Sequence, residues 1–381
     1  MCILPQLTTQ STRRLHFFSK ADWKTIHAEA SDLSTNILEG KKNGDDTCLL
    51  WNSFKSSLAD IINRNVPSKV AKKRKSLPWF SHQLKRMVRR KARLYKKAKS
   101  SNQWDKFKDF QRKCKKAFRT AEEEHVNSSI IKGLDNNNSK PFWRYVKAKR
   151  QDRTGIPPLK QNGSLVHDSK DKAQILVSQF ESVFKKANND LPPTKSCQHE
   201  IESLTITVEG VEKLLAGINI SKAVGPDNIP NIVLKECSKE LAPGLTAIFQ
   251  LSVSTGTLPP DWVNANITPV FKKGDVHSAE NYRPVSLTSV VCKLLEHIIC
   301  KHMMDHLETN NILTSLNHGF RSGHSTETQL LTTVHDLVTA NDKRKQTDVA
   351  ILDFSKAFDT VPHNKLLHKL TSYGIKGPIH R

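Results

Sequence analysis

Asp353 is the residue of this sequence best placed to do chemistry. It directly follows the short apolar run Val349-Ala-Ile-Leu352, which predicts a buried central strand. An acid at the end of such a strand is costly unless something pairs with it, and carboxylate oxygens are ligands that Mg²⁺ prefers. Two-metal phosphoryl transfer needs such a carboxylate and at least one more nearby. Taken alone, the pattern is more typical of a strand end or a helix N-cap.

Two neighbouring sets of residues could suggest further metal ligands. Asp359 would share a face with Asp353 only if the strand continued, and Val361-Pro362 indicates that the strand has ended. We therefore expect Asp359 in a turn or helix-capping role. His302 and His306 are four residues apart on a predicted amphipathic helix without a matching third ligand, so a half-exposed helix face is the better interpretation.

The positive charge of the chain is concentrated in one segment. Residues 69–119, here called the basic segment, hold 21 Lys or Arg and two acids, which gives +19 of the total +23. This density is typical of phosphate binding, and such contacts position a nucleic acid without reading its sequence. Candidate phosphate-binding residues are Lys72, Lys73, Arg74, Lys75, Arg89, Arg90, Lys91, Arg93, Lys96 and Lys97. A solvated helical face, a nuclear-localisation patch and an anionic membrane surface are the alternatives.

The basic segment must form helices to present these charges. No Pro or Gly lies between Trp79 and Glu124. Apolar residues recur at helical spacing from Leu84 to Tyr95 and again from Phe107 to Phe118. The pattern predicts two amphipathic helices with a break near residues 100–102.

The remaining sequence predicts an α+β chain in three regions: a helical region at 1–66, a basic helical linker region at 67–200, and a third region at 201–381. Asn162-Gly163 predicts a hairpin turn, and a helix follows over 173–184. Residues 187–200 have the composition of a linker. Further on we expect a turn at Gly225-Pro-Asp227 and a helix from Leu241 that stops at Gly256.

The third region predicts a β-hairpin followed by two helices. Asn266–Phe271 and Tyr282–Thr288 are predicted to pair across the Lys272–Asp275 turn. A long helix is predicted over 291–307, and Thr326 with Gln329 forms the pattern of a capping box before a second helix. Apolar residues from Leu330 to Val338 share one face of that second helix.

Composition excludes several classes of protein. No apolar run approaches the length of a transmembrane helix, and Met1–Pro5 is too short for a signal-peptide core. The seven cysteines contain no C-x-x-C spacing, so neither a zinc site nor a disulfide framework is indicated. We expect an intracellular protein that is neither secreted nor bound to a membrane.

Several ordered blocks resemble the reverse transcriptases of non-LTR, LINE-type retrotransposons, in particular the jockey-like elements. Ile267-Thr-Pro-Val-Phe-Lys-Lys-Gly274 and Asn281-Tyr-Arg-Pro-Val-Ser-Leu287 are similar to the fingers hairpin. His318-Gly-Phe-Arg-Ser-Gly-His-Ser-Thr326 resembles the fingers-to-palm block, and Leu352-Asp-Phe-Ser-Lys-Ala-Phe-Asp-Thr-Val-Pro-His363 resembles the first palm motif. Lys222-Ala-Val-Gly-Pro-Asp-Asn-Ile-Pro230 matches an upstream block, and Leu77-Pro-Trp-Phe80 with Pro141-Phe-Trp143 resembles the linker after the endonuclease.

The resemblance implies the partial fingers and palm of a right-hand polymerase, with Mg²⁺ (or Mn²⁺), an RNA template, a DNA primer and dNTPs. Asp353 matches the catalytic metal-binding aspartate and the carbonyl of Phe354 a backbone metal ligand. Phe358 matches the aromatic gate that excludes a 2′-hydroxyl; core packing is its alternative. Arg283 and one of Lys272 or Lys273 match the residues that hold the triphosphate, with a solvated turn as the alternative. Gly319, Phe320 and Arg321 match a block in which Arg321 either contacts the template or braces the fingers.

The same resemblance implies that further metal ligands and the thumb follow the last residue, because no F/Y-A-D-D sequence is present. We therefore expect this chain alone not to polymerise. The alternative function is a non-catalytic nucleic-acid-binding protein that uses the basic segment.

Overall fold

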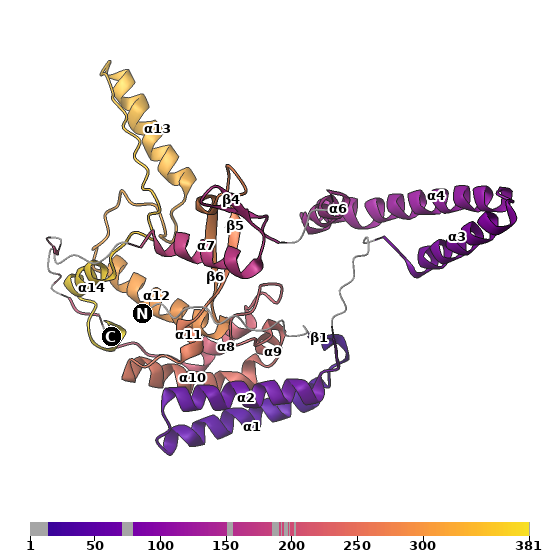
Figure 1. Cartoon of the computed structure of the whole chain (residues 1–381). Helices are drawn as coiled ribbons and strands as arrows, with labels where there is room; N and C mark the ends of the chain where they lie inside the picture. The colour runs from indigo at the N-terminus through magenta and orange to yellow at the C-terminus, as the bar shows by residue number, and fades with distance from the viewer. Residues whose placement is uncertain are drawn as a thin grey trace. The chain divides into compact units, whose positions relative to one another are not determined.

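The computed structural model describes residues 14–70, 79–150, 155–184, 190–191, 193, 197, 199–201 and 203–380. Within helix α6 the side chains of 147–150 are not described. The chain divides into two compact units, Met1–Lys69 with Pro157–Arg381, here the core unit, and Val70–Ile156, here the basic unit. Figure 1 shows the helices and strands of both units, with most of them labelled.

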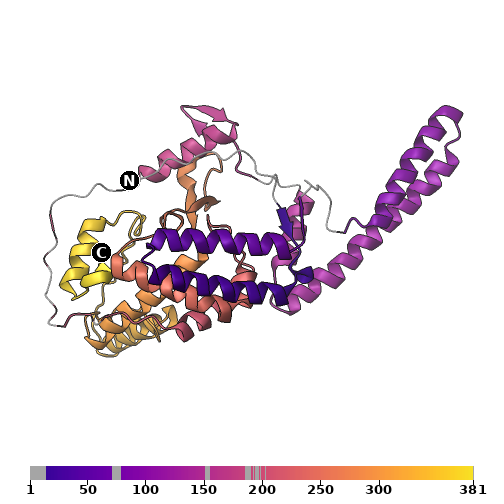
Figure 2. The same ribbon diagram turned by 90° about the horizontal axis from the view of Figure 1, so that it is seen from below.

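The core unit is built around three long helices. Helices α1 (Trp23–Lys42) and α2 (Thr47–Asn65) begin at Asp22 and Asp46, whose side chains accept hydrogen bonds from the first-turn amides. Their apolar faces bury Ile26, Leu33, Ile37, Trp51, Phe54 and Leu58. Both faces pack against α10 (Ser238–Thr255), as Figures 1 and 2 show.

Sequence-distant contacts therefore hold this core together. Ser34 Oγ donates a 2.5 Å hydrogen bond to the carbonyl of Glu240, and a side chain at Gly244 would meet Ser34 at 3.0 Å. The helical region at 1–66 and the region from 201 share one hydrophobic cluster, although the sequence pattern separates them. The apolar faces of α1 and α2 have to be buried, and α10 covers both of them.

Shorter helices complete the same core. They are α8 (Val208–Ala216), α9 (Asn231–Glu236) and α11 (Pro260–Val263). Helix α10 ends where predicted, with Gly256 in the left-handed conformation at φ 67°. Helix α12 (Val290–Thr309) confirms the long helix predicted over 291–307.

The described residues contain three two-stranded sheets. Strand β1 (Arg14–His16) pairs with β2 (Ser68–Val70), and β3 (Leu159–Gln161) pairs antiparallel with β4 (Ser164–Val166). Strands β5 (Asn266–Phe271) and β6 (Tyr282–Leu287) pair antiparallel, with Phe271 opposite Tyr282. The predicted Asn162-Gly163 turn is confirmed, because both residues have positive φ as a two-residue hairpin requires. Helix α7 (Ser169–Glu181) follows.

Two predictions for the C-terminal part are wrong. The capping box of α13 (Thr326–Asp342) joins Ser325 to Thr328, one residue earlier than the predicted Thr326 and Gln329. Val349–Leu352 forms no strand and is exposed, with Ile351 at 91%. A central strand needs neighbours on both sides, and no strand in the described ranges pairs with this run.

The basic unit is a helical hairpin with a short extension. Helices α3 (His82–Ser101) and α4 (Asp105–His125) lie side by side (Figure 1), and the predicted break near 100–102 is confirmed by Asn102 at φ 53°. A π-helical turn at Val126–Ile131, α5 (Lys132–Asp135) and α6 (Lys140–Arg150) follow. In the described part of the chain, no helix is long and apolar enough to cross a membrane.

Three 3₁₀ turns and one more helix complete the secondary structure. The turns are Phe18–Lys20, Ala279–Asn281 and Gly377–His380, and the helix is α14 (His363–Ser372). The 3₁₀ turn at Ala279–Asn281 leads directly into β6.

Candidate nucleic-acid interface and nucleotide site

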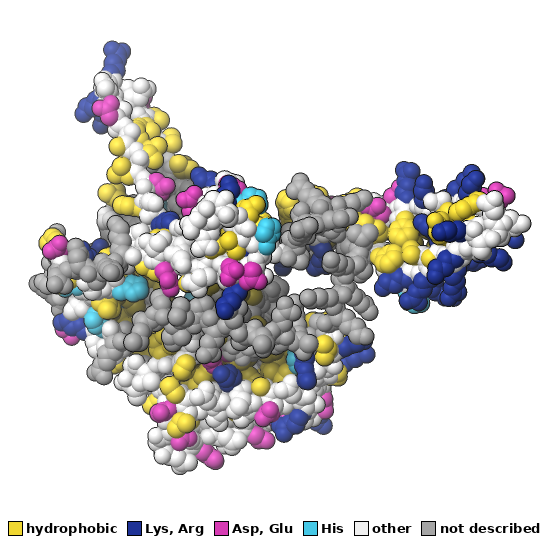
Figure 3. Space-filling view, viewed as in Figure 1, with side chains coloured by type: hydrophobic (Ala, Val, Ile, Leu, Met, Phe, Trp, Pro, Cys, Tyr) yellow, Lys and Arg dark blue, Asp and Glu magenta, His cyan; other side chains and the backbone are white. Residues whose placement is uncertain are grey.

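The α3–α4 hairpin presents its charges outward. Leu84, Ala98 and Cys114 are buried between the two helices. Five of the candidate phosphate-binding residues are exposed and a sixth, Lys91, is half-buried. The exposed ones are Arg89, Arg90, Arg93, Lys96 and Lys97. Lys72, Lys73, Arg74 and Lys75 lie outside the described residues. Figure 3 shows Lys and Arg side chains gathered over this hairpin.

Few acids neutralise this surface. Asp109 lies 3.7 Å from Arg112, and Glu123 lies 2.9 Å from Arg119. Arg90 instead lies over the ring of Phe110 at 5.0 Å, which fixes a guanidinium at the helix surface. The hairpin can therefore attract a polyanion through many exposed cations, and contacts of this kind position a nucleic acid without reading its sequence.

The β5–β6 hairpin carries the predicted triphosphate residues. Arg283 lies on β6 opposite Val270 and is exposed. Lys272 and Lys273 are exposed in the turn after β5, where the Lys272 amide donates a 2.9 Å hydrogen bond to the carbonyl of Asn281. Among the described residues, none of these three cations lies within 4 Å of a carboxylate. All three cations are thus available to an anionic ligand.

The loop between these strands is fixed by the β3–β4 hairpin. Lys160 Nζ lies 2.8 Å from Asp275 Oδ2, and the Lys160 amide donates to the carbonyl of His277 at 2.8 Å. The hydrogen bond from the Lys160 side chain holds the pKa of Asp275 below its usual value. The β3–β4 hairpin therefore holds the middle of the 272–281 loop at Asp275 and His277, although the sequence gives no signal for this contact.

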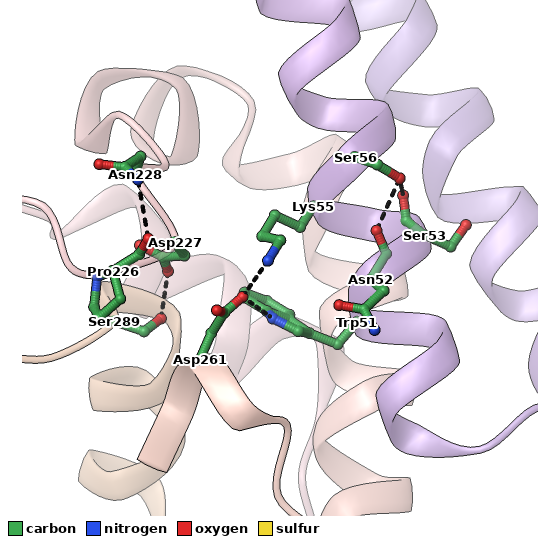
Figure 4. Close-up of polar contacts among 10 residues, drawn as sticks. All are labelled: Trp51, Asn52, Ser53, Lys55, Ser56, Pro226, Asp227, Asn228, Asp261 and Ser289. Atoms are coloured by element: carbon green, nitrogen blue, oxygen red, sulfur yellow. Dashed lines mark hydrogen bonds and ion pairs between the residues drawn. The ribbon is translucent and has the colours of Figure 1, made fainter. Parts of the chain in front are cut away.

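Asp227, in the Gly225-Pro-Asp227 turn, contacts the start of α12 (Figure 4). Ser289, the N-cap of α12, is completely buried and donates a 2.6 Å hydrogen bond to Asp227 Oδ2. The same Ser289 hydroxyl accepts from the Cys292 amide at 3.2 Å. A Cβ at Gly225 would lie 2.5 Å from the Ser289 amide, so only glycine permits this approach.

Burial raises the pKa of Asp227 above its ordinary value, and the hydrogen bond from Ser289 opposes that rise. Within the described residues, Asp227 Oδ1 is buried without a hydrogen-bond partner. The upstream block therefore ties the turn to the corner where β6 enters α12. The sequence pattern did not predict this role; the signal for it is a Ser directly before an apolar helical run.

A second polar link in Figure 4 joins α2 to α11. Asp261 Oδ2 accepts hydrogen bonds from Trp51 Nε1 at 3.0 Å and from Lys55 Nζ at 2.5 Å. The two networks in Figure 4 use residues far apart in sequence. Together they fix the base of the β5–β6 hairpin against the helical core.

Arg321 is an internal brace in this structure. Its guanidinium binds both carboxylate oxygens of Glu308, at 2.8 and 2.5 Å, and donates to the carbonyl of Thr314 at 2.8 Å. Its side chain is only 11% exposed. Of the two sequence interpretations, the geometry favours bracing of the segment after α12 over contact with a template.

The Asp353 segment is exposed rather than set into a groove. Asp353, Phe354 and Phe358 are all exposed, with Phe358 at 79%, which argues against core packing for Phe358 here. Phe358 meets Phe320, in the 318–326 block, with the ring centroids 5.9 Å apart and nearly perpendicular. The structure thus brings two of the predicted blocks together at these rings.

The structure assembles no metal-ligand cluster around Asp353 within the described residues. Asp359 lies in a turn, its amide donating to the carbonyl of Lys356 at 3.0 Å. His306 Nε2 lies 2.8 Å from the carbonyl of Tyr373. The turn at Asp359 and the half-buried position of His306 on α12 agree with the turn and the half-exposed helix face that the sequence favoured.

Parts of this chain are similar to known polymerases of transposable elements. Residues 270–381 match the family model described as reverse transcriptase (RNA-dependent DNA polymerase). The RNA-directed DNA polymerase from mobile element jockey of Drosophila melanogaster is 24% identical over 361 residues, which cover 91% of this chain and 39% of that protein. The chain is thus similar to the RNA-directed DNA polymerases of jockey elements.

Two further proteins of transposable elements are similar to parts of this chain. The probable RNA-directed DNA polymerase from transposon BS of Drosophila melanogaster is 27% identical over 242 residues, 60% of this chain and 26% of that protein. A Pol polyprotein from type-1 retrotransposable element R2 of Popillia japonica is 29% identical over 126 residues, 33% of this chain and 17% of that protein. The chain spans well under half the length of these relatives.

Proposed function

We propose that this chain forms the fingers and the first part of the palm of an RNA-directed DNA polymerase. The parent reaction adds dNTPs to a DNA primer on an RNA template, within a nuclear or cytoplasmic ribonucleoprotein. The observation that carries the proposal is the β5–β6 hairpin, most of which lies within the family match at 270–381. It leaves Lys272, Lys273 and Arg283 exposed, with no carboxylate among the described residues paired to them. Cations so placed suit the triphosphate, whose charge must be neutralised during phosphoryl transfer.

The metal-binding role belongs to Asp353 in this proposal. Its exposed carboxylate and the carbonyl of Phe354 are hard oxygen donors, which fit Mg²⁺ or Mn²⁺. Bound there, the ion would neutralise phosphate charge and orient the reacting oxygens. Phe358 would lie beneath the sugar and exclude a 2′-hydroxyl. One carboxylate holds such an ion weakly, so we expect the 381-residue chain alone not to polymerise.

Photolabelling tests the triphosphate site. A dNTP with a photoreactive base is crosslinked to the full chain with Mg²⁺ and a template–primer. Arg283→Ala and Lys272→Ala should each lower labelling several-fold, whereas Lys301→Ala, an exposed lysine on α12, should not. Equal labelling of all variants would contradict the assignment.

A second function, nucleic-acid binding by the basic unit, rests on the exposed charges of α3 and α4. We propose that these helices hold RNA or DNA through phosphates. The logarithm of the affinity should fall linearly with the logarithm of salt concentration, with a slope near −0.9 per phosphate contact on duplex DNA. Affinity should vary little with base sequence.

Charge removal tests this second function. Replacing Lys96, Lys97 and Lys99 together by Gln should reduce the slope by about two to three, since each lost phosphate contact removes about 0.9. The matched control replaces Lys41, Lys42 and Lys213, outside the basic unit. A binding constant that does not change with salt, or a control that weakens binding as much, would refute the proposal.

A further inference from the structure

Three potential metal ligands meet in the core unit, away from Asp353. They are His27 on α1, Cys237 at the end of α9, and Glu240 in the first turn of α10. One ligand atom from each residue lies within 4.8 Å of the other two. In the residues that the structure describes, this is the one group of three or more His, Cys, Asp or Glu side chains so arranged.

The contacts among these side chains satisfy only part of their hydrogen-bonding capacity. His27 Nδ1 and Glu240 Oε1 lie 3.0 Å apart. Even so, His27 Nδ1 and Glu240 Oε2 are buried atoms with no hydrogen-bond partner among the described residues. The Cys237 side chain is completely buried beside them. A simple ion pair would leave these polar atoms unsatisfied, which is costly.

The backbone beneath the cluster is held firmly. The Cys237 amide donates to the carbonyl of Val233 at 3.0 Å. Ser34, two turns beyond His27 on α1, donates to the carbonyl of Glu240 at 2.5 Å. The close approach of α1 to Gly244 fixes the spacing of the two helices. Small side-chain rotations on a fixed frame are then enough to bring the three donors to a common ion.

The chemistry of the donors selects the ion. Zn²⁺ binds thiolate sulfur at about 2.3 Å and imidazole nitrogen or carboxylate oxygen at about 2.0–2.2 Å. Ligands of one tetrahedral ion therefore lie about 3–4 Å apart. Here His27 Nδ1 and Glu240 Oε1 are 3.0 Å apart, and all three donors lie within 4.8 Å of one another. A thiolate, a carboxylate and a neutral imidazole also balance the charge of a divalent ion. The thiolate disfavours Mg²⁺, which prefers oxygen donors.

We infer that His27, Cys237 and Glu240 form a zinc site that joins α1 to the corner between α9 and α10, with a fourth position for water. The site ties the N-terminal helices to the helix pair that packs on them, and it is separate from the polymerase residues. The absence of C-x-x-C spacing hides such a site from sequence analysis, because its ligands are contributed by segments more than 200 residues apart.

The test measures zinc on the full chain. Protein is loaded with ZnCl₂, passed through a desalting column and assayed for zinc by mass spectrometry. The expected result is one zinc per chain, and His27→Gln and Cys237→Ser should each lose it. The controls His335→Gln and Cys300→Ser alter exposed residues and should keep it. His27 is half-exposed, so its variant tests the site even if the Cys237 variant does not fold.

Two further measurements make the outcome decisive. Co²⁺ in place of Zn²⁺ should give a thiolate charge-transfer band that is absent in Cys237→Ser. Zinc at about 100 times its dissociation constant should favour the folded state about 100-fold and raise the melting temperature by a few degrees, with no shift in His27→Gln. Failure of the wild-type chain to retain zinc, or equal retention by His27→Gln, would overturn the inference.

Discussion

The contact between Asp227 and Ser289 should couple the upstream turn to the start of α12. The perturbation is a double-mutant cycle of Asp227→Ala and Ser289→Ala. Both side chains are buried, Asp227 at 9% exposure and Ser289 at 0%, and their 2.6 Å bond involves a charged acceptor. Hydrogen bonds of this kind contribute about 1.5–3 kcal/mol, which is the coupling energy expected from the cycle.

The two single variants should differ in how much they lower the free energy of unfolding. Ser289→Ala also removes the N-cap of α12, which adds about 1 kcal/mol, and it leaves a buried carboxylate without its donor. Asp227→Ala leaves the cap in place, because Ser289 Oγ still accepts from the Cys292 amide. Ser289→Ala should therefore destabilise the chain more than Asp227→Ala does. Urea unfolding followed by circular dichroism gives these free energies of unfolding.

The pH dependence of the free energy of unfolding supplies a second readout of the Asp227 environment. The pKa of Asp227 is raised by burial above its ordinary value of 3.8. A raised folded-state pKa stabilises the fold most below the ordinary value, and this contribution is lost as the pH rises through the folded-state pKa. Asp227→Asn should flatten this part of the pH profile while keeping an oxygen that accepts from Ser289. A coupling energy near zero, or an unchanged profile in Asp227→Asn, would refute the reasoning.

Three further predictions concern other parts of the chain. Gly225→Ala should lower the free energy of unfolding by about 1–3 kcal/mol, as overpacking does, because its Cβ would lie 2.5 Å from the Ser289 amide. Gly319→Ala is the control, since its Cβ would have no contact under 3.6 Å. Equal melting temperatures for the two variants would contradict this prediction. In primer extension on an RNA template with Mg²⁺ or Mn²⁺, the chain should add no nucleotide; extension by the wild type but not by Asp353→Ala would show that a complete site forms. At pH 8, iodoacetamide should label exposed Cys300 before Cys237, since burial raises the pKa of the Cys237 thiol to about 12; mass spectrometry of partly labelled protein checks the order.

Local structure could be predicted from the sequence where the pattern is periodic or the turn chemistry is specific. The apolar spacing in the basic segment located both helices and their break at Asn102. Gly256 marked the end of α10, and Asn162-Gly163 fixed a hairpin. In each case the information lies within a few residues, because helix faces, caps and tight turns are set by local sterics and hydrogen bonds.

Contacts between distant segments could not be predicted in this way. Nothing in the spacing of α1 indicates that α10 covers its apolar face, and Lys160 gives no sign of its contact with Asp275. The apolar run before Asp353 shows that a local pattern can fail when it depends on distant partners. Its composition predicts a buried strand, yet burial depends on partner strands, and Ile351 is 91% exposed. The blocks that resemble the polymerase predicted candidate site residues, but not that Phe358 would meet Phe320.

Hydrogen–deuterium exchange of the full chain, with and without an RNA template–DNA primer and a dNTP, tests the central proposal most directly. The proposal predicts slower exchange in two places, along 82–119 of α3 and α4 and across 270–283 of the β5–β6 hairpin. Exchange in α1 and α2 should not change. Protection confined to α1 and α2, or no protection in either predicted segment, would contradict the proposed role in RNA-directed DNA synthesis.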